Sequence, residues 1–156
     1  MVFLNKNFKI ILISTAIVML FLLIYFLSDL ENTNIKEEKI VTKIIDGDTI
    51  IIQGGETIRL LGIDCDEKGK ECYDDAKKYL EENLLGKTVL TEKESEDKDI
   101  YGRYLRYLFL DGDNFNVKIV KEGYCIARIY SETKYKEEIQ QAEEYAIKNK
   151  IGCKWS

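Results

Sequence analysis

The sequence of 156 residues contains no histidine and no proline. The lack of histidine excludes a serine–histidine–acid triad, histidine-based nucleases and nearly every catalytic zinc site. Any chemistry must therefore come from carboxylates, lysines, arginines, tyrosines or cysteines. The lack of proline means that turns must be made with glycine, asparagine, aspartate or serine.

Positive charge is not in excess either. The net charge at pH 7 is −5, from 23 basic and 28 acidic residues. Domains that bind nucleic acid are usually basic, so this balance argues against tight, nonspecific binding to long DNA. Binding of nucleic acid through local basic groups and a divalent cation that bridges to phosphate remains compatible with this net charge. A hydrophobic content of 46% beside 33% charged residues is typical of a globular protein of about one domain.

The chain has only four cysteines, and no two of them are spaced as Cys-x-x-Cys. Together with the lack of histidine, this spacing argues against a zinc site. Two disulfides are expected if the domain lies outside the cytosol, and four cysteines allow three pairings. We favour Cys65–Cys72, which closes a short loop, together with Cys125–Cys153, which ties down the C-terminal tail. The alternative is four reduced cysteines in the core.

Long hydrophobic runs are confined to the N-terminus. Residues 10–27 are apolar except for one serine and one threonine, and as a helix they measure roughly 27 Å, close to the thickness of a bilayer core. Lys6 and Lys9 precede this run, and acidic residues follow it. Because positive charge stays inside, residues 1–28 are expected to form a single-pass membrane anchor with a cytoplasmic N-terminus. A cleaved signal peptide, and therefore secretion, is the alternative.

The rest of the chain divides into two parts. Residues 29–38 are charged, polar and without hydrophobic period, which predicts a linker. Residues 39–156 carry the globular domain. We therefore expect a protein of the cell membrane, held there through residues 10–27, with its domain outside. No protein partner is indicated.

The expected elements of the domain are three strands, a helix, two strands and further helices. Five short, mostly antiparallel strands closed by a helix fit a five-stranded Greek-key β-barrel of the OB-fold type, with about three α-helices. Such barrels bind oligonucleotides on one face. The expected strands cover residues 40–45, 49–53, 56–63, 87–94 and 105–110, and the expected helices cover residues 72–85, 115–122 and 135–149.

Two acidic clusters and one arginine lie between residues 46 and 67. The sequence Asp-Gly-Asp-Thr at 46–49 precedes an expected strand. The cluster Asp-Cys-Asp-Glu at 64–67 follows the strand that contains Arg59. Carboxylates at strand ends suit a hard cation such as Ca²⁺ or Mg²⁺, and an arginine beside them suits a phosphate. The combination is the chemistry needed to cut a phosphodiester.

Each of these pieces also fits an ordinary surface turn when it is taken alone. Asp-Gly-Asp recurs at 111–113, where no arginine or acidic cluster is near in sequence, and we interpret this second copy as a turn with a helix cap. The turn at 99–103, which leads into a strand that opens with Arg103, equally fits a plain loop tip. The segments become informative only together.

Together, these segments resemble the staphylococcal nuclease (thermonuclease) family. The resemblance runs from about residue 40 to the C-terminus, and the segments occur in the family's order. The family fold is an OB barrel with helices, which agrees with the order of elements above. The segments are Ile-Asp-Gly-Asp-Thr at 45–49, Arg-Leu-Leu-Gly-Ile-Asp-Cys-Asp-Glu at 59–67, Asp-Ile-Tyr-Gly-Arg at 99–103, residues 117–123 and the closing Trp155.

The resemblance implies a site for one calcium ion. Asp48 and Asp64 match the family's calcium-binding carboxylates. Cys65 stands where the family usually has threonine, whose backbone carbonyl is the ligand. A carbonyl needs no particular side chain, so this substitution is tolerable. Ca²⁺ is expected in preference to Mg²⁺.

The resemblance also implies catalytic and substrate-binding residues. Glu67 matches the glutamate usually assigned as general base, while Arg59 and Arg103 match the two phosphate-binding arginines. Tyr101 resembles a tyrosine that lines the nucleotide site. Asp66 departs from the family, which usually has proline there, and adds negative charge beside the metal. The family's basic surface is missing as well.

These roles imply a calcium-dependent endonuclease that hydrolyses phosphodiester bonds of DNA, RNA or both and leaves 3′-phosphate ends. One alternative is a non-catalytic OB-fold module, tethered to the membrane, that binds single-stranded nucleic acid without cutting it. A membrane-tethered scaffold for another protein is a third interpretation. The presence of both arginines, both aspartates and the glutamate favours the enzyme.

Overall fold

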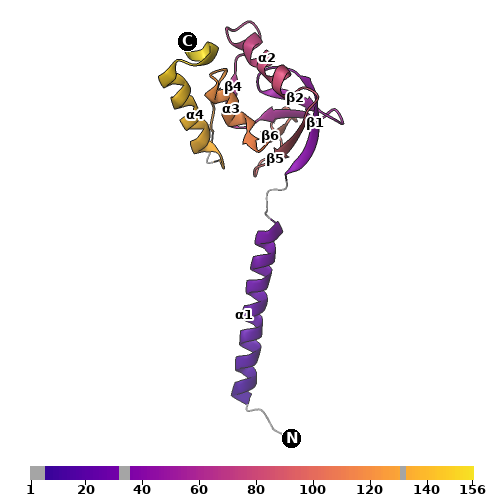
Figure 1. Cartoon of the computed structure of the whole chain (residues 1–156). Coiled ribbons are helices and arrows are strands. Elements are labelled where there is room, and N and C mark those ends of the chain that lie inside the picture. Colours follow the sequence, from indigo (N-terminus) through magenta and orange to yellow (C-terminus); the bar gives the residue numbers. More distant parts are fainter. Residues whose placement is uncertain (1–5, 32–35, 131–132) are drawn as a thin grey trace. The chain divides into compact units, whose positions relative to one another are not determined.

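The computed structural model describes residues 6–31, 36–130 and 133–156. The chain forms two compact units that divide after residue 34. The first unit contains helix α1 (Lys6–Glu31), and the second contains every other helix and strand that the structure describes (Figure 1).

Helix α1 contains the apolar run that the sequence predicts to span a membrane. Within the part of the chain that the structure describes, no helix has both the length and the hydropathy that a membrane span requires. The expected anchor is therefore not confirmed. The expected linker at residues 29–38 overlaps the end of α1 and the start of strand β1 (Glu37–Ile44), and its residues 32–35 lie outside the described residues.

Five strands close into a barrel, as the sequence predicts: β1, β2 (Thr49–Ile52), β3 (Thr57–Leu60), β5 (Thr88–Glu92) and β6 (Tyr104–Leu110). Their order around the barrel is β3-β2-β1-β5-β6, and neighbours in this order pair antiparallel. A parallel pairing between β3 and β6 closes the ring. Apolar residues of β2 and β3, such as Ile50 and Ile58, are buried inside it.

Strand β3 ends earlier than the sequence predicts. The expected strand over residues 56–63 is interrupted at Gly62, whose φ is +76°, a conformation that favours glycine because it has no Cβ. A Cβ at this position would also lie 2.6 Å from Cδ1 of Ile139. The chain therefore turns out of the barrel at this point.

The residues after this turn form a second, smaller sheet that the sequence did not predict. Strand β4 (Ile63–Cys65) pairs antiparallel with strand β8 (Cys125–Ala127), and Asp64 lies opposite Ile126. Each strand has only three residues, too few for an alternating pattern to stand out. This sheet places the start of the 64–67 cluster beside the barrel.

Helices cover the barrel and complete the core (Figure 1). Helix α2 contacts β1, while α3 contacts β6 on one side and α4 on the other. Asn114 caps α3 by accepting hydrogen bonds from the backbone N–H groups of Asn116 and Val117. The turn is thus formed by residues 111–112, and the cap is Asn114, the residue after the Asp-Gly-Asp segment. The remaining elements are α2 (Tyr73–Leu84), β7 (Asp113–Asn114), α3 (Phe115–Lys121), α4 (Lys136–Asn149) and the single turn α5 (Gly152–Trp155).

The favoured disulfide pairing is wrong. The bonds join Cys65 to Cys125 and Cys72 to Cys153. Cys65 and Cys125 face each other directly across the β4–β8 pair, with their Cα atoms 4.4 Å apart, which is within the range that a disulfide spans. The short loop between Cys65 and Cys72 does not bring their side chains together, because Cys72 lies at the start of α2 against the C-terminal turn. The alternative of four reduced cysteines is also wrong.

Candidate active site

Arg59 is the centre of a group of charged residues that the fold brings together from separate strands. Its Nε lies 3.1 Å from Oδ1 of Asp48, and a terminal nitrogen lies 3.3 Å from Oδ1 of Asp64. Its other terminal nitrogen donates to the carbonyl of Leu60 at 2.7 Å. The two predicted metal-binding carboxylates therefore lie on either side of one predicted phosphate-binding arginine.

Asp48 is the buried member of this group, with only 6% of its surface exposed. Its carboxylate accepts hydrogen bonds from the Thr49 hydroxyl and from the backbone N–H of Cys65, each at 3.0 Å. Burial raises the pKa of Asp48 to about 6, although the Arg59 guanidinium and these donors act in the opposite direction. The negative charge of Asp48 is thus not fully compensated by its protein partners, which is the situation a bound cation would correct.

Gly47 allows this close arrangement. A Cβ at this position would lie 2.7 Å from the Cβ atoms of both Ala76 and Cys65. A side chain would therefore push apart helix α2 and strand β4, which meet over the backbone of residue 47. This explains why the 46–49 segment needs its glycine even though the conformation there is ordinary.

The raised pKa predicts a stability effect in metal-free protein. The contribution of Asp48 to the free energy of unfolding is fully present below about pH 4 and is lost as pH rises through about 6, because the folded state binds the proton more tightly. The free energy of unfolding falls by about 3 kcal/mol over this range. In EDTA, urea unfolding of the wild-type chain should become easier over this range, and Asp48→Asn should lack that component. An equally steep decline in both proteins would contradict the prediction.

Arg103 joins the same group through Thr49. A terminal nitrogen of Arg103 lies 3.3 Å from the Thr49 hydroxyl oxygen, and that hydroxyl donates to Asp48. The Nε of Arg103 pairs with Oδ2 of Asp99 at 2.7 Å. Both predicted arginines therefore belong to one connected network, although they lie far apart in the sequence.

Asp99 shapes the loop that presents Arg103 and Tyr101. Its Oδ1 accepts the backbone N–H groups of Tyr101 and Arg103 at 2.9 and 3.0 Å. Burial raises the pKa of Asp99, but these hydrogen bonds and the Arg103 guanidinium outweigh burial and lower it overall. Neither Thr49 nor Asp99 was assigned a role from the sequence, although both belong to segments that the family resemblance quotes.

Tyr101 projects into solvent beside Arg103. Its side chain is 78% exposed, and the Arg103 guanidinium carbon lies 5.5 Å from the ring centre. An exposed ring held by a cation offers a flat surface on which a base can stack. The substrate-binding role of Tyr101 stays a prediction.

Arg128 is a further cation in the same region that the sequence did not single out. It follows β8, and its backbone N–H donates to the carbonyl of Gly62 at 2.8 Å. A hydrogen bond to the Tyr130 hydroxyl, the charge of that tyrosine and the nearby Asp64 carboxylate raise the pKa of Arg128. Arg128 can be recognised as a neighbour of Asp64 only once β4 and β8 are known to pair.

Glu67 is the predicted site residue that the structure does not join to this network. It is exposed, and its side chain has no hydrogen bond or ion pair with any residue that the structure describes. It lies two residues beyond β4, in the loop that leads to α2. Glu67 is therefore only three residues from Asp64 in the sequence, but their side chains form no hydrogen bond with each other.

The expected calcium site is not confirmed as a cluster of side chains. Among the residues described, no group of three or more histidine, cysteine, aspartate or glutamate side chains is arranged to hold a metal. Two carboxylates, Asp48 and Asp64, are nevertheless each paired with Arg59. Their oxygens suit Ca²⁺, and the uncompensated charge of Asp48 fits a cation there.

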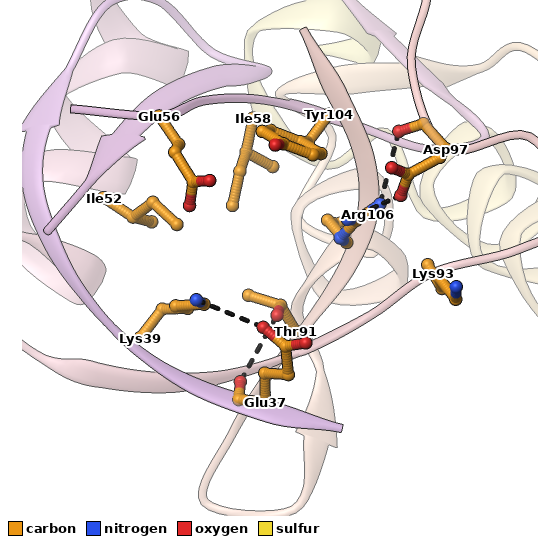
Figure 2. Close-up of a pocket in the computed structure, with 10 residues that line it drawn as sticks. All are labelled: Glu37, Lys39, Ile52, Glu56, Ile58, Thr91, Lys93, Asp97, Tyr104 and Arg106. Atoms are coloured by element: carbon orange, nitrogen blue, oxygen red, sulfur yellow. Dashed lines mark hydrogen bonds and ion pairs between the residues drawn. The ribbon is translucent and has the colours of Figure 1, made fainter. Parts of the chain in front are cut away.

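A cavity of about 320 Å³ lies elsewhere on the barrel, between strands β1, β3, β5 and β6 (Figure 2). Four of its charged residues form two ion pairs, Lys39 with Glu37 at 3.1 Å and Arg106 with Asp97 at 2.7 Å. None of the predicted catalytic or metal-binding residues lines it. The candidate site is therefore the network around Arg59 and not this cavity.

Comparison with known proteins identifies the family of the chain. Residues 57–156 match the family model described as staphylococcal nuclease homologue. The chain is 36% identical over 141 residues to a thermonuclease of Staphylococcus hyicus, covering 81% of this chain and 80% of the relative. It is 37% identical over 126 residues to a thermonuclease of Staphylococcus intermedius, covering 74% and 75%.

A third relative, endonuclease YncB of Bacillus subtilis, is 34% identical over 126 residues, which cover 73% of this chain and 59% of the relative. The matched residues 57–156 contain the barrel strands β3, β5 and β6, the small sheet and helices α2 to α5. Of the network described above, they include Arg59, Asp64 and Arg103. The chain belongs to the staphylococcal nuclease family of hydrolases.

Proposed function

We propose that this protein is a calcium-dependent endonuclease that hydrolyses phosphodiester bonds of DNA, RNA or both and leaves 3′-phosphate ends. The observation that carries the proposal is the connected network of two arginines and two carboxylates, Arg103–Thr49–Asp48–Arg59–Asp64. Relatives named thermonuclease and endonuclease support a nuclease activity. The calcium dependence and the product ends rest on the family resemblance.

Arg59 and Arg103 are proposed to bind the scissile phosphate. A guanidinium has two N–H groups on each terminal nitrogen and one on Nε. Arg59 uses one N–H at each of its nitrogens for protein partners, and Arg103 uses its Nε and one terminal nitrogen. Both arginines therefore retain donors for phosphate oxygens while their protein contacts hold them in position.

Glu67 is proposed as the general base. Its carboxylate accepts a proton from the water whose oxygen attacks phosphorus. The bond from phosphorus to the 5′ oxygen breaks, and that oxygen takes up a proton from solvent to leave as a hydroxyl. Charge that develops on the phosphoryl oxygens is stabilised by the two guanidinium groups. A calcium ion held by Asp48, Asp64 and the Cys65 carbonyl would neutralise further charge on that phosphate. Tyr101 supplies a ring for a neighbouring base.

The metal dependence is tested with the full-length chain on single-stranded DNA and on RNA, in calcium, in magnesium and in EDTA. We expect cleavage in calcium, weaker cleavage in magnesium and none in EDTA. Half-maximal activity should require calcium on the order of 10⁻⁴–10⁻³ M, because few protein ligands are offered. End-group analysis should find 3′-phosphates. Cleavage that persists in EDTA would rule out the metal role.

A binding module that does not cut is the second candidate, and the isolated position of Glu67 is the observation that favours it. In that case the chain binds single strands tightly but produces no cleavage with any divalent metal. The same assay therefore separates the two functions, provided that binding is measured beside cleavage.

We also propose that the domain acts outside the cytosol. Its two disulfides support this, because such bonds form and persist in oxidising compartments. Attachment to the cell membrane through residues 10–27, with secretion after signal cleavage as the alternative, stays a prediction from the sequence.

A further inference from the structure

The position of Glu67 depends on the backbone of its loop. Residues 66–72 connect β4 to α2, and Glu67 has no side-chain partner among the described residues that could orient it. Within the loop, the backbone N–H of Lys70 donates to the carbonyl of Glu67 at 3.0 Å. Whatever holds this loop therefore also determines where the Glu67 carboxylate can reach.

Two consecutive residues of the C-terminal turn hold the two ends of this loop. Nζ of Lys154 lies 2.6 Å from Oδ1 of Asp66, at the beginning of the loop. Cys153 forms a disulfide with Cys72, at its end. Oδ2 of Asp66 also accepts the backbone N–H of Cys72 at 3.0 Å, which closes the loop on itself. We call Asp66, Lys154 and the Cys72–Cys153 disulfide the C-terminal clamp.

The turn that carries the clamp is itself fixed to the domain. The backbone N–H of Lys154 donates to the carbonyl of Gly123 at 3.1 Å. A Cβ on Gly152 would collide with the carbonyl oxygens of Glu122 and Gly123, so the two backbones approach as closely as glycine permits. Gly123 lies just before β8, which pairs with β4. The clamp is therefore connected to the sheet that carries Asp64.

The ion pair of the clamp is a direct contact, with Nζ of Lys154 2.6 Å from Oδ1 of Asp66. Both side chains are only 20% exposed, so solvent screens this pair less than a surface pair. Asp66 is the position where the family usually has proline. Proline restricts the backbone by its ring, whereas Asp66 restricts it by two side-chain contacts.

We propose that the C-terminal clamp positions Glu67 for proton abstraction, with Asp66 and Lys154 as positioning residues that do not touch the substrate. The inference rests on the proposed function, in which Glu67 is the base. Proton transfer depends steeply on geometry, and a displacement of about 1 Å can cost as much as 10²-fold in rate. Loosening the clamp should therefore lower turnover without changing how phosphate or calcium binds.

The test uses full-length Lys154→Met, with Lys154→Arg as the conservative variant and Lys87→Met as the matched control. Lys87 is exposed and its side chain pairs with none of the described residues. We expect Lys154→Met to lower kcat about tenfold while KM and the calcium requirement change less than about twofold. Lys154→Arg should keep most of the activity, and Lys87→Met should behave as wild type. Hydrogen exchange at residues 67–71 should speed up in Lys154→Met alone.

A double-mutant cycle with Glu67→Gln separates positioning from general stability. If the clamp acts through Glu67, Lys154→Met has no further effect on the residual kcat of Glu67→Gln. The clamp's role would be overturned if Lys154→Met lowered kcat equally in the wild-type and Glu67→Gln backgrounds. It would also be overturned if Lys154→Met left kcat unchanged while Glu67→Gln was strongly impaired. A fully active Glu67→Gln would instead overturn the base assignment. A wild-type chain without cleavage would overturn the proposed function, and the clamp's role with it.

Discussion

Replacing Arg103 by glutamine should lower kcat for single-stranded DNA by about 10²–10³, the usual cost of removing one preorganised charge stabiliser. The side chain of Arg103 is 30% exposed, and Asp99 and Thr49 hold it in position. It keeps N–H groups that can bind the phosphate. Its removal leaves Asp99 close enough to solvent to be rehydrated. The variant should therefore fold normally, which circular dichroism can check.

Arg106→Gln is the matched control for this experiment. Arg106 lies on β6, three residues beyond Arg103, and pairs with Asp97 at 2.7 Å. It lines the cavity of Figure 2, which none of the residues of the Arg59 network lines. The control should cleave as wild type does. Turnover that is unchanged in Arg103→Gln, or reduced equally in both variants, would argue against a phosphate-binding role for Arg103. Arg59 is less suitable for this test, because it also compensates the buried Asp48.

The sequence was sufficient to predict the barrel and to select several residues that the fold brings together. The alternation along β3, with Ile58 and Leu60 on one face and Arg59 on the other, is a local property, and the structure buries Ile58 and Leu60 as that pattern predicts. The convergence of Arg59 with Arg103 is not local. It arises because Thr49 lies opposite Arg59 in the β2–β3 pair, while β3 pairs in parallel with β6, whose first residue follows Arg103.

The disulfides show why other features could not be predicted. Sequence separation favours a bond between Cys65 and Cys72, because a short loop costs little entropy to close. The actual partner of Cys65 is set by the β4–β8 pairing, which depends on the turn at Gly62 and on two strands of three residues each. Those strands gave no periodic signal. The same pairing brings Arg128 near Asp64, which explains why that cation was missed as well.

Removing the Cys65–Cys125 disulfide, with both cysteines changed to alanine, should lower the free energy of unfolding by about 4 kcal/mol on the chain-entropy estimate. The bond closes a loop with a sequence separation of 60. It should also weaken calcium activation by about tenfold, because a loosened β4–β8 pair lets the Cys65 N–H move away from Asp48 and displaces two of the predicted calcium ligands. Thermal unfolding and calcium titration of cleavage measure the two effects.

The matched variant removes Cys72–Cys153, again with alanine at both positions. Its loop has a sequence separation of 81, so the chain-entropy estimate predicts a similar loss of stability, about 4–5 kcal/mol. Its effect on activity should differ in kind, because that bond holds the loop of Glu67 and leaves the contact between Cys65 and Asp48 intact. We expect kcat to fall while the calcium requirement stays constant. If both variants shift the calcium requirement equally, the two disulfides do not support separate parts of the site, and their effect on activity is one of stability alone.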